Sequence, residues 1–311
     1  MSTAVESAFK PSNHKDLLMM KRNKLPLSWI TAYDFPSAYC AEISGIDMIL
    51  IGDSGAMVQY GLERTSGIDM NLMIEMSKAV RRGASKTLLV GDMPRGSYEI
   101  SDQMAVSNAL RFMIEGECDL VKLEGISNST GKRIELITEA GIPVIGHLGL
   151  TPQSLGRIEK YKVAGKEVDE ILKLKRDISM LQDCGAVAVL LEAIPPNLME
   201  KLSQISDIPI YGIGCGVKSD GQLLIYHDVV GYYPKFRPKF AKNFATEVLR
   251  NFNSNNPKTE LSGINFLKDG IGEISVRSII EYVRQVKSFE FPTREYCYAD
   301  LDQELVNNQF K

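Results

Sequence analysis

The chain has 311 residues, of which 44% are hydrophobic and 24% charged, and its formal net charge is -3. This size suits one barrel-sized domain or two smaller ones. The acidic balance argues against a nucleic-acid partner, and no stretch reaches the roughly 18 apolar residues of a membrane span. Residues 1–15 are polar and lack the apolar core of a secretion signal, so the expected location is the cytoplasm.

The cysteines are odd in number and scattered, without the CxxC spacing of a zinc site. This pattern indicates reduced thiols in a reducing compartment rather than a disulfide framework. The five are Cys40, Cys118, Cys184, Cys215 and Cys297.

The chain then alternates between short apolar runs and amphipathic segments. Residues 1–12 are expected to form a loose tail, and residues 14–23 a helix that covers the bottom of a barrel. Expected strands lie at 25–34, 46–53, 87–92, 120–124, 143–147, 186–192, 208–213 and 223–226. Expected helices lie at 36–44, 71–82, 101–115, 131–140, 167–184, 196–205 and 239–252.

Such strict alternation, about eight times over, predicts a single-domain α/β fold, a (β/α)8 TIM barrel. An open doubly wound sheet remains the main alternative, because the last unit is irregular. The catalytic barrel would span residues 13–253. Residues 254–311 would form a polar linker, an amphipathic helix at 274–289 and a C-terminal arm.

Polar residues stand where the predicted strands end. Residues 49–54 (ILIGDS) and 88–92 (LLVGD) each place an aspartate after an apolar run and a glycine. The full set is Asp34, Asp53, Asp92, Glu124, His147 and Glu192. In a barrel the carboxyl ends of the strands meet at one face, where active sites lie. Two aspartates from neighbouring strands would there suit a hard cation such as Mg²⁺.

Two further side chains have both a structural and a functional interpretation. Lys122 and Glu124 are two residues apart and share a face of their strand. They either bridge layers of the core as an ion pair or place a cation for a substrate carboxylate beside an acid that orders metal-bound water. His147 is either a satisfied structural group or a site residue, since it ends a strand.

Two loops near the same face are less specific. The glycine-rich sequence at 212–216 (GIGCG) follows the seventh strand, where barrels often bind phosphate, but it lacks the full GxGxxG pattern. The polar loop around Lys160, Lys162 and Gly165 is either a lid or an ordinary surface loop.

Several stretches are specific enough to indicate a family. The chain resembles the ketopantoate (3-methyl-2-oxobutanoate) hydroxymethyltransferases of the phosphoenolpyruvate-mutase-like superfamily. The most specific matches are residues 146–154 (GHLGLTPQS) and 220–228 (DGQLLIYHD). Others are 31–38 (TAYDFPSA), 45–54 (GIDMILIGDS), 121–125 (VKLEG), 161–166 (YKVAGK) and 239–244 (KFAKNF).

The resemblance implies a specific reaction and a set of site residues. The enzyme would move a one-carbon unit from 5,10-methylenetetrahydrofolate to 3-methyl-2-oxobutanoate, giving 2-dehydropantoate for pantothenate biosynthesis through a Mg²⁺-stabilised enolate. It implies that Asp53 and Asp92 hold Mg²⁺, with Glu124 completing the shell through water. Asp53, Ser54, Asp92 and Lys122 would contact the keto acid, and Glu192 would accept the proton. From its place at a strand end, His147 would orient a metal-bound water or hydrogen-bond the substrate. The resemblance also implies a homo-oligomer, a decamer.

The sequence departs from the family in loops around the expected site. The differences lie at residues 55–71, at Arg95 and at residues 159–160, and the segment from residue 253 onward exceeds the usual family length. Arg95 motivates an alternative, a paralogous Mg²⁺-dependent C–C lyase or aldolase that acts on another 2-oxo acid. A degenerate barrel kept for assembly is the non-enzymatic alternative, against which the retained acidic residues argue.

Overall fold

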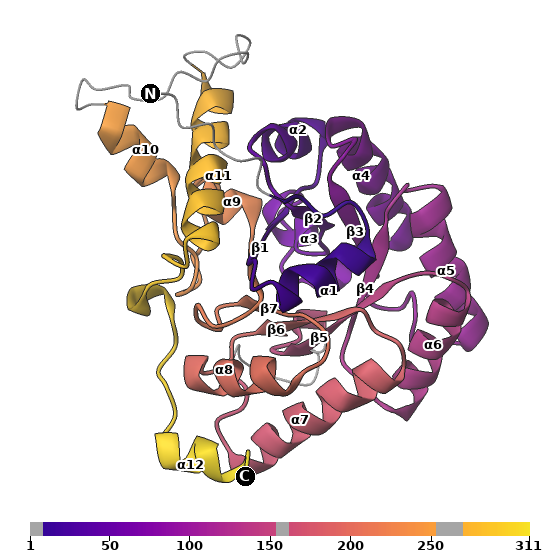
Figure 1. Ribbon diagram of the computed structural model, residues 1–311. Helices are drawn as coiled ribbons and strands as arrows, with labels where there is room; N and C mark the ends of the chain where they lie inside the picture. The colour runs from indigo at the N-terminus through magenta and orange to yellow at the C-terminus, as the bar shows by residue number, and fades with distance from the viewer. Residues whose placement is uncertain (1–8, 154–161, 253–269) are drawn as a thin grey trace.

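Eight parallel strands close into a barrel in the computed structural model, which describes residues 9–153, 162–252 and 270–311 (Figure 1). Each strand pairs with the next along the chain, and the last returns to the first, with Leu27 aligned to Gly221. The strands are β1 Leu27–Thr31, β2 Met48–Ile51, β3 Leu88–Asp92, β4 Leu120–Glu124, β5 Val144–Gly149, β6 Ala188–Glu192, β7 Ile210–Ile213 and β8 Gly221–Leu224. This closed order confirms the predicted (β/α)8 TIM barrel and excludes the open doubly wound sheet.

Helices surround the barrel, as alternating strand and helix units require. They are α1 His14–Arg22, α2 Phe35–Ile43, α3 Gly55–Val58, α4 Met70–Gly83, α5 Asp102–Ile114, α6 Asn128–Glu139, α7 Val168–Asp183, α8 Pro196–Ile205, α9 Tyr226–Val229, α10 Ala245–Phe252, α11 Ile271–Lys287 and α12 Gln303–Asn308. Single turns of 3-10 helix lie at η1 Thr65–Gly67 and η4 Arg294–Tyr296. Most predicted helices agree with these bounds within three residues, and α8 agrees at both ends.

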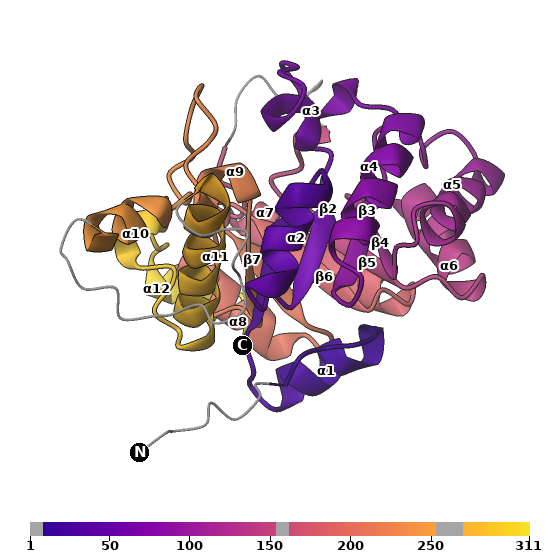
Figure 2. The ribbon, with the colours of Figure 1, turned by 90° about the horizontal axis from the view of Figure 1, so that it is seen from above.

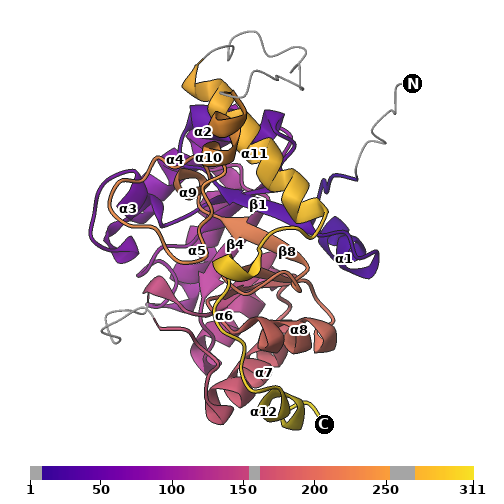
Figure 3. The ribbon, with the colours of Figure 1, turned by 90° about the vertical axis from the view of Figure 1, so that its left-hand side faces the viewer.

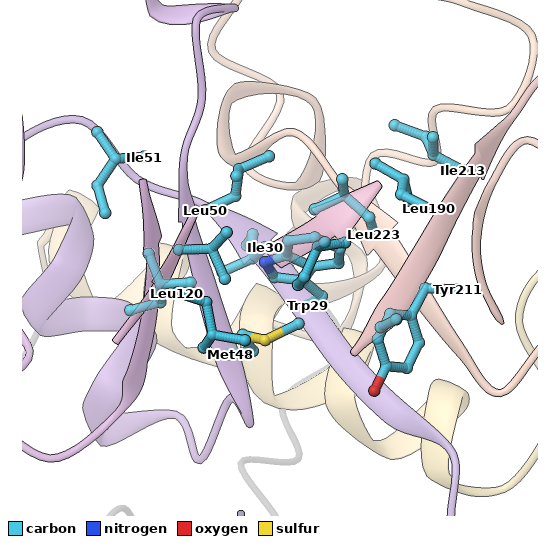
Figure 4. Close-up of a cluster of buried hydrophobic side chains, with 14 of the residues drawn as sticks. Trp29, Ile30, Met48, Leu50, Ile51, Leu120, Leu190, Tyr211, Ile213 and Leu223 are labelled. Carbon is cyan, nitrogen blue, oxygen red and sulfur yellow. The ribbon is translucent and has the colours of Figure 1, made fainter. Parts of the chain in front are cut away.

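Large apolar side chains fill the interior of the barrel (Figure 4). Trp29 and Tyr211 meet edge to face, with ring centroids 5.9 Å apart, and Met48 and Leu223 lie close by in the same buried cluster. Strands buried on both faces explain the nearly continuous apolar runs in the sequence. The interior is therefore a packed core, and the space for chemistry lies above it, at the strand ends.

Helices α1 and α11, which precede and follow the eight strands in the sequence, cover parts of the barrel. The N-terminal helix α1 lies below the barrel (Figure 2), where Lys21 Nζ contacts Asp220 Oδ2 at 2.8 Å, just before β8 begins. This arrangement confirms the predicted bottom cover. Helix α11 packs against β1 and β8, because the Tyr282 hydroxyl contacts the carbonyl oxygens of Trp29 and Gln222 at 2.9 and 2.6 Å. The helix predicted beyond the barrel thus covers two of its strands.

The eighth unit departs from its predicted bounds. Strand β8 begins at Gly221, because a Cβ there would lie 2.3 Å from the carbonyl oxygen of Leu27 on β1. Tyr226 does not extend the strand but begins α9. The helix predicted at 239–252 begins only at Ala245, because residues 239–244 follow an irregular path that buries Phe240.

Parts of the predictions lie outside the described residues. These are most of the N-terminal tail, the first part of the polar loop at 160–165 and the polar linker at 253–258. Within the described ranges, no helix is both long enough and apolar enough to cross a bilayer.

Candidate active site

Five of the six polar residues predicted at strand ends gather at the carboxyl-terminal mouth of the barrel. Asp92, Glu124 and Glu192 are the last residues of β3, β4 and β6, Asp53 follows β2, and His147 lies in β5. Asp34 has a different role, because its side chain accepts a hydrogen bond from the backbone N–H of Ser37 at 2.8 Å and caps α2.

Lys122 is buried among the carboxylates of this group. Its Nζ lies 2.8 Å from Asp92 Oδ1 and 3.7 Å from Glu124 Oε1, with only 2% of its side chain exposed. The strand register explains the closer contact, since Asp92 is aligned with Lys122 across β3 and β4. Burial disfavours the ammonium ion, but the charges of Asp92, Glu124 and Asp53 outweigh it and raise the pKa of Lys122. The lysine is therefore a fixed cation.

His147 connects two carboxylates on neighbouring strands. Its Nδ1 lies 3.2 Å from Glu124 Oε1, and its Nε2 lies 3.3 Å from Glu192 Oε2, although the second pair is not aligned as a hydrogen bond. Burial and Lys122 disfavour the imidazolium, but interactions with Glu124 and Glu192 outweigh them and raise the pKa of His147 to about 9. The carboxylates thus favour the imidazolium form, and Nδ1 lies between Glu124 and Lys122, whose Nζ is 3.3 Å away.

The two aspartates are buried and electrostatically coupled. The backbone N–H of Asp53 donates to Asp92 Oδ2 at 3.1 Å. Burial raises the pKa of Asp53 well above its usual value, and the charges of Asp92 and Glu124 raise it further, while Lys122 opposes them. Burial also raises the pKa of Asp92, against the opposing charge of Lys122. The site holds more negative charge than its lysine offsets.

Gln153 is a buried residue of this network that the sequence did not single out. Its backbone N–H donates to Glu124 Oε2 at 2.9 Å, and its Nε2 donates to Asp53 Oδ2 at 3.0 Å. Its Oε1 accepts from the hydroxyl of Tyr98 at 2.9 Å. A polar residue in an irregular loop gives no periodic signal, although its place in the family stretch GHLGLTPQS was visible.

The backbone around Glu192 is tightly constrained. Its carbonyl oxygen accepts the N–H of Leu150 at 2.9 Å, and a Cβ on Gly149 would lie 2.3 Å from that oxygen. The next residue, Ala193, has φ of 51°, a left-handed conformation that is rare outside glycine. The Glu192 side chain remains 14% exposed, more than its two neighbours Glu124 and His147. It therefore faces the open end of the barrel.

Ser54 lies beside Asp53, as the sequence predicts. Its Oγ is 2.9 Å from the hydroxyl of Tyr33, which follows β1. Ser54 is half-buried, so its hydroxyl is positioned by Tyr33 next to the acidic pair.

The glycine-rich loop at 212–216 and Arg95 both have structural explanations. Gly214 adopts φ of 70°, and a Cβ there would lie 2.7 Å from the ring of Phe240, so the GIGCG sequence allows this ring to pack on the end of β7. Arg95 is exposed, and its Nη1 donates to the backbone carbonyl of Gln153, which connects the loops after β3 and β5.

The donor set does not form a closed metal cage. Across residues 9–153, 162–252 and 270–311, no group of three or more histidine, cysteine, aspartate or glutamate residues is arranged to hold a metal ion directly. The carboxylates of Asp53 and Asp92 are close enough for the charge of Asp92 to raise the pKa of Asp53, and Lys122 lies between Asp92 and Glu124.

Comparison with known proteins identifies the family. Residues 12–253 match the model of the ketopantoate hydroxymethyltransferase family. The chain belongs to this family. It is 42% identical over 287 residues to a 3-methyl-2-oxobutanoate hydroxymethyltransferase from Alkaliphilus metalliredigens, covering 92% of this chain and 93% of that protein. A Bacillus cereus protein of the same name is 39% identical over 292 residues, covering 94% of this chain and 96% of the relative. This family membership makes the chain an enzyme, a hydroxymethyltransferase.

The alignments with these relatives cover 92–94% of this chain and therefore reach beyond residue 253, where the match to the family model ends.

Solved structures support the fold assignment. The barrel is similar to phosphonopyruvate hydrolase, with a TM-score of 0.56 at 12% identity, covering 89% of this chain and 99% of that one. It is also similar to 2,3-dimethylmalate lyase, described as a PEP mutase/isocitrate lyase superfamily member, with a TM-score of 0.55 at 13% identity, covering 86% and 95%. At such low identity the likeness concerns the fold alone.

Proposed function

We propose that the enzyme transfers a one-carbon unit from 5,10-methylenetetrahydrofolate to 3-methyl-2-oxobutanoate, giving 2-dehydropantoate. The observation that carries this proposal is the row of Lys122, His147 and Glu192 on β4, β5 and β6, beside the aspartate pair. A cation for a substrate carboxylate thus shares the mouth of the barrel with a carboxylate base, and His147 lies between them. Removal of a proton beside a keto group needs both.

The aspartate pair fits Mg²⁺ on its chemistry. Hard cations prefer carboxylate oxygens, and Mg²⁺ commonly binds one or two carboxylates and keeps several waters. Asp53 and Asp92 would hold it, and Glu124 would act through a water. The Asp92 charge adds to burial in raising the pKa of Asp53, a repulsion that a cation would relieve. Bound Mg²⁺ would serve as a Lewis acid toward the keto and carboxylate oxygens of the substrate.

Glu192 is proposed to take the proton from C3 of the 2-oxo acid. The electron pair left on C3 then forms the new C–C bond to the one-carbon unit, and both bonds of that carbon to folate nitrogens break. Water supplies the hydroxyl group of the product, and its other proton and the proton taken from C3 end on the two nitrogens. His147 would orient the base, since its Nε2 lies 3.3 Å from Glu192 Oε2. Lys122 neutralises the substrate carboxylate, and Ser54, positioned by Tyr33, hydrogen-bonds the substrate.

The same proposal extends to the setting of the enzyme. We place it in the cytoplasm as a homo-oligomer, a decamer by family resemblance. All five cysteines are buried and free of disulfides, which suits a reducing compartment. Chain mass measured in solution tests the oligomer.

One assay tests the reaction. The purified enzyme is incubated with Mg²⁺, 3-methyl-2-oxobutanoate and 5,10-methylenetetrahydrofolate, and 2-dehydropantoate is measured. Product formation that requires all three supports the proposal. Cleavage of another 2-oxo acid without any 2-dehydropantoate would favour the lyase alternative, and Arg95, which connects two loops here, provides no support for that alternative.

A further inference from the structure

A basic pocket lies beside the mouth of the barrel and has no role in the chemistry above. It has a volume of about 420 Å³ and lies among the segment after α9, helix α10 and the turn η4. Four cations and a single carboxylate line it, in a chain whose overall net charge is -3. They are Arg237, Lys239, Lys242, Arg250 and Glu247.

Most of the positive charge in this pocket is not neutralised. Glu247 is engaged, because its carboxylate pairs with Lys242 at 2.8 Å and accepts from Gln285 at 3.2 Å. Within the described part of the chain, Arg237, Lys239 and Arg250 have no carboxylate within ion-pair distance. Lys242 is buried over the ring of Phe244, at 4.7 Å from its centroid, so the floor of the pocket is a fixed structure.

Two contacts on one side relate the pocket to the rim of the barrel. Phe240, next to Lys239, packs on Gly214 at the end of β7. Lys239 Nζ lies 5.9 Å from the ring centroid of Tyr298. Burial raises the pKa of the Tyr298 hydroxyl, and the nearby charge of Glu192 raises it further.

On the opposite side, Lys235 Nζ donates to the carbonyl of Gly61 at 3.4 Å, in the loop that follows α3. Figure 3 shows the segment between α9 and α10 curving toward α3. The segment that carries the cations therefore borders the mouth of the barrel from the β2 side to the β7 side.

We propose that this pocket binds the carboxylates of the glutamate tail of the folate co-substrate. A folate bound with its reactive end at Glu192 carries these anions at the other end of the molecule, so a cationic pocket at the rim is their natural partner. The inference rests on the proposed function and adds a binding site to it. It predicts that donors with longer glutamate tails bind more tightly.

The test compares two donors in three proteins. KM is measured for monoglutamyl and triglutamyl 5,10-methylenetetrahydrofolate in the wild type, in Arg237→Gln/Lys239→Gln and in the charge-matched control Arg82→Gln/Lys86→Gln. The control residues are exposed at the end of α4 and before β3, away from the mouth. Neither pair belongs to the catalytic machinery.

The wild type and the control should have a KM about fivefold lower for the triglutamyl donor, and this advantage should shrink at high salt. The pocket variant should lose the advantage while kcat and the KM for the 2-oxo acid stay unchanged. An unchanged ratio of the two KM values in the pocket variant would overturn the inference alone. Absence of product with either donor in the wild type would instead overturn the proposed function.

Discussion

Nε2 of His147 lies 3.3 Å from Oε2 of Glu192, so an imidazole on β5 faces the candidate base on the neighbouring strand β6. The same ring reaches Glu124 through Nδ1 at 3.2 Å. One imidazole therefore connects the acid proposed to order metal-bound water with the acid proposed to take the proton. This relation explains why a histidine stands in β5, where a residue that only fills the core would be apolar.

His147→Gln should lower kcat about 10- to 100-fold, as losses of such orienting partners commonly do. Glutamine keeps a donor but cannot contact Glu124 and Glu192 together as a cation. The KM for the 2-oxo acid should change little, because Lys122 remains. Steady-state kinetics measure both values, with His14→Gln in α1 as the control. Full activity in His147→Gln would remove the positioning role.

Gly149→Ala should distort the backbone that carries Glu192. Gly149 has φ of 87°, which disfavours any residue with a side chain, and an added Cβ would lie 2.3 Å from the carbonyl oxygen of Glu192. The matched control is Gly141→Ala, which has φ of 84° but no atom within 4 Å of the added Cβ. Conformational strain alone should lower the free energy of unfolding by roughly 1–2 kcal/mol in both variants, and the collision should add about 1–3 kcal/mol at Gly149.

Denaturant unfolding and kcat distinguish the two glycine variants. Only Gly149→Ala should also lose activity per folded molecule. Equal destabilisation and equal activity in the two proteins would show that the close approach to Glu192 does not matter.

Asp228 gives a pH dependence of stability with a defined sign. Burial raises its pKa to about 7, against the charge of Arg237. Between about pH 4 and pH 7 the native state therefore holds a proton that the unfolded chain has released, so stability falls as pH rises through this window. Burial lowers the pKa of His227 to about 4, which gives an opposite slope between pH 4 and about 6.5.

Asp228→Asn isolates the carboxyl contribution, because asparagine does not titrate. Relative to the wild type, the variant should become progressively more stable from pH 4 to pH 7, by up to a few kcal/mol. Thermal or urea unfolding at several pH values measures this difference, and the exposed Asp207→Asn serves as the control. A difference curve that is flat with pH would contradict the assignment.

The proposed Mg²⁺ site predicts that Asp92→Asn loses activity and that added Mg²⁺ does not restore it. The wild type should lose activity with a chelator and regain it with Mg²⁺. Asp92→Asn keeps the size of the side chain but removes one of the two proposed carboxylate ligands, so its activity should stay below detection at the same Mg²⁺ concentration. Turnover that persists in chelator would refute a metal-dependent reaction.

The positions of most site residues could be predicted because the end of each strand in the sequence corresponds to one face of the barrel. Asp92, Glu124 and Glu192 end apolar runs, and parallel closure brings such ends to one face. Gln153 could not be assigned a role in this way, since it contacts Asp53 across 100 positions of sequence from a loop without periodicity.

Tertiary packing overrode local preference at the end of the barrel. Residues 239–244 have a composition that suits a helix, but burying Phe240 against Gly214 and Phe244 in the core requires an irregular path. Strand β8 likewise begins where Gly221 permits contact with β1, two residues before the apolar run that marked it. Neither constraint is visible from local sequence alone.

The central claim is that Glu192 takes the C3 proton of the 2-oxo acid. Exchange of this proton for deuterium is followed by NMR in wild type and in Glu192→Gln, with Mg²⁺ and 3-methyl-2-oxobutanoate but no folate. Glutamine preserves shape but cannot accept the proton, so the wild type should exchange it and the variant should not, while both still bind the keto acid. Exchange at the wild-type rate in Glu192→Gln would contradict the account.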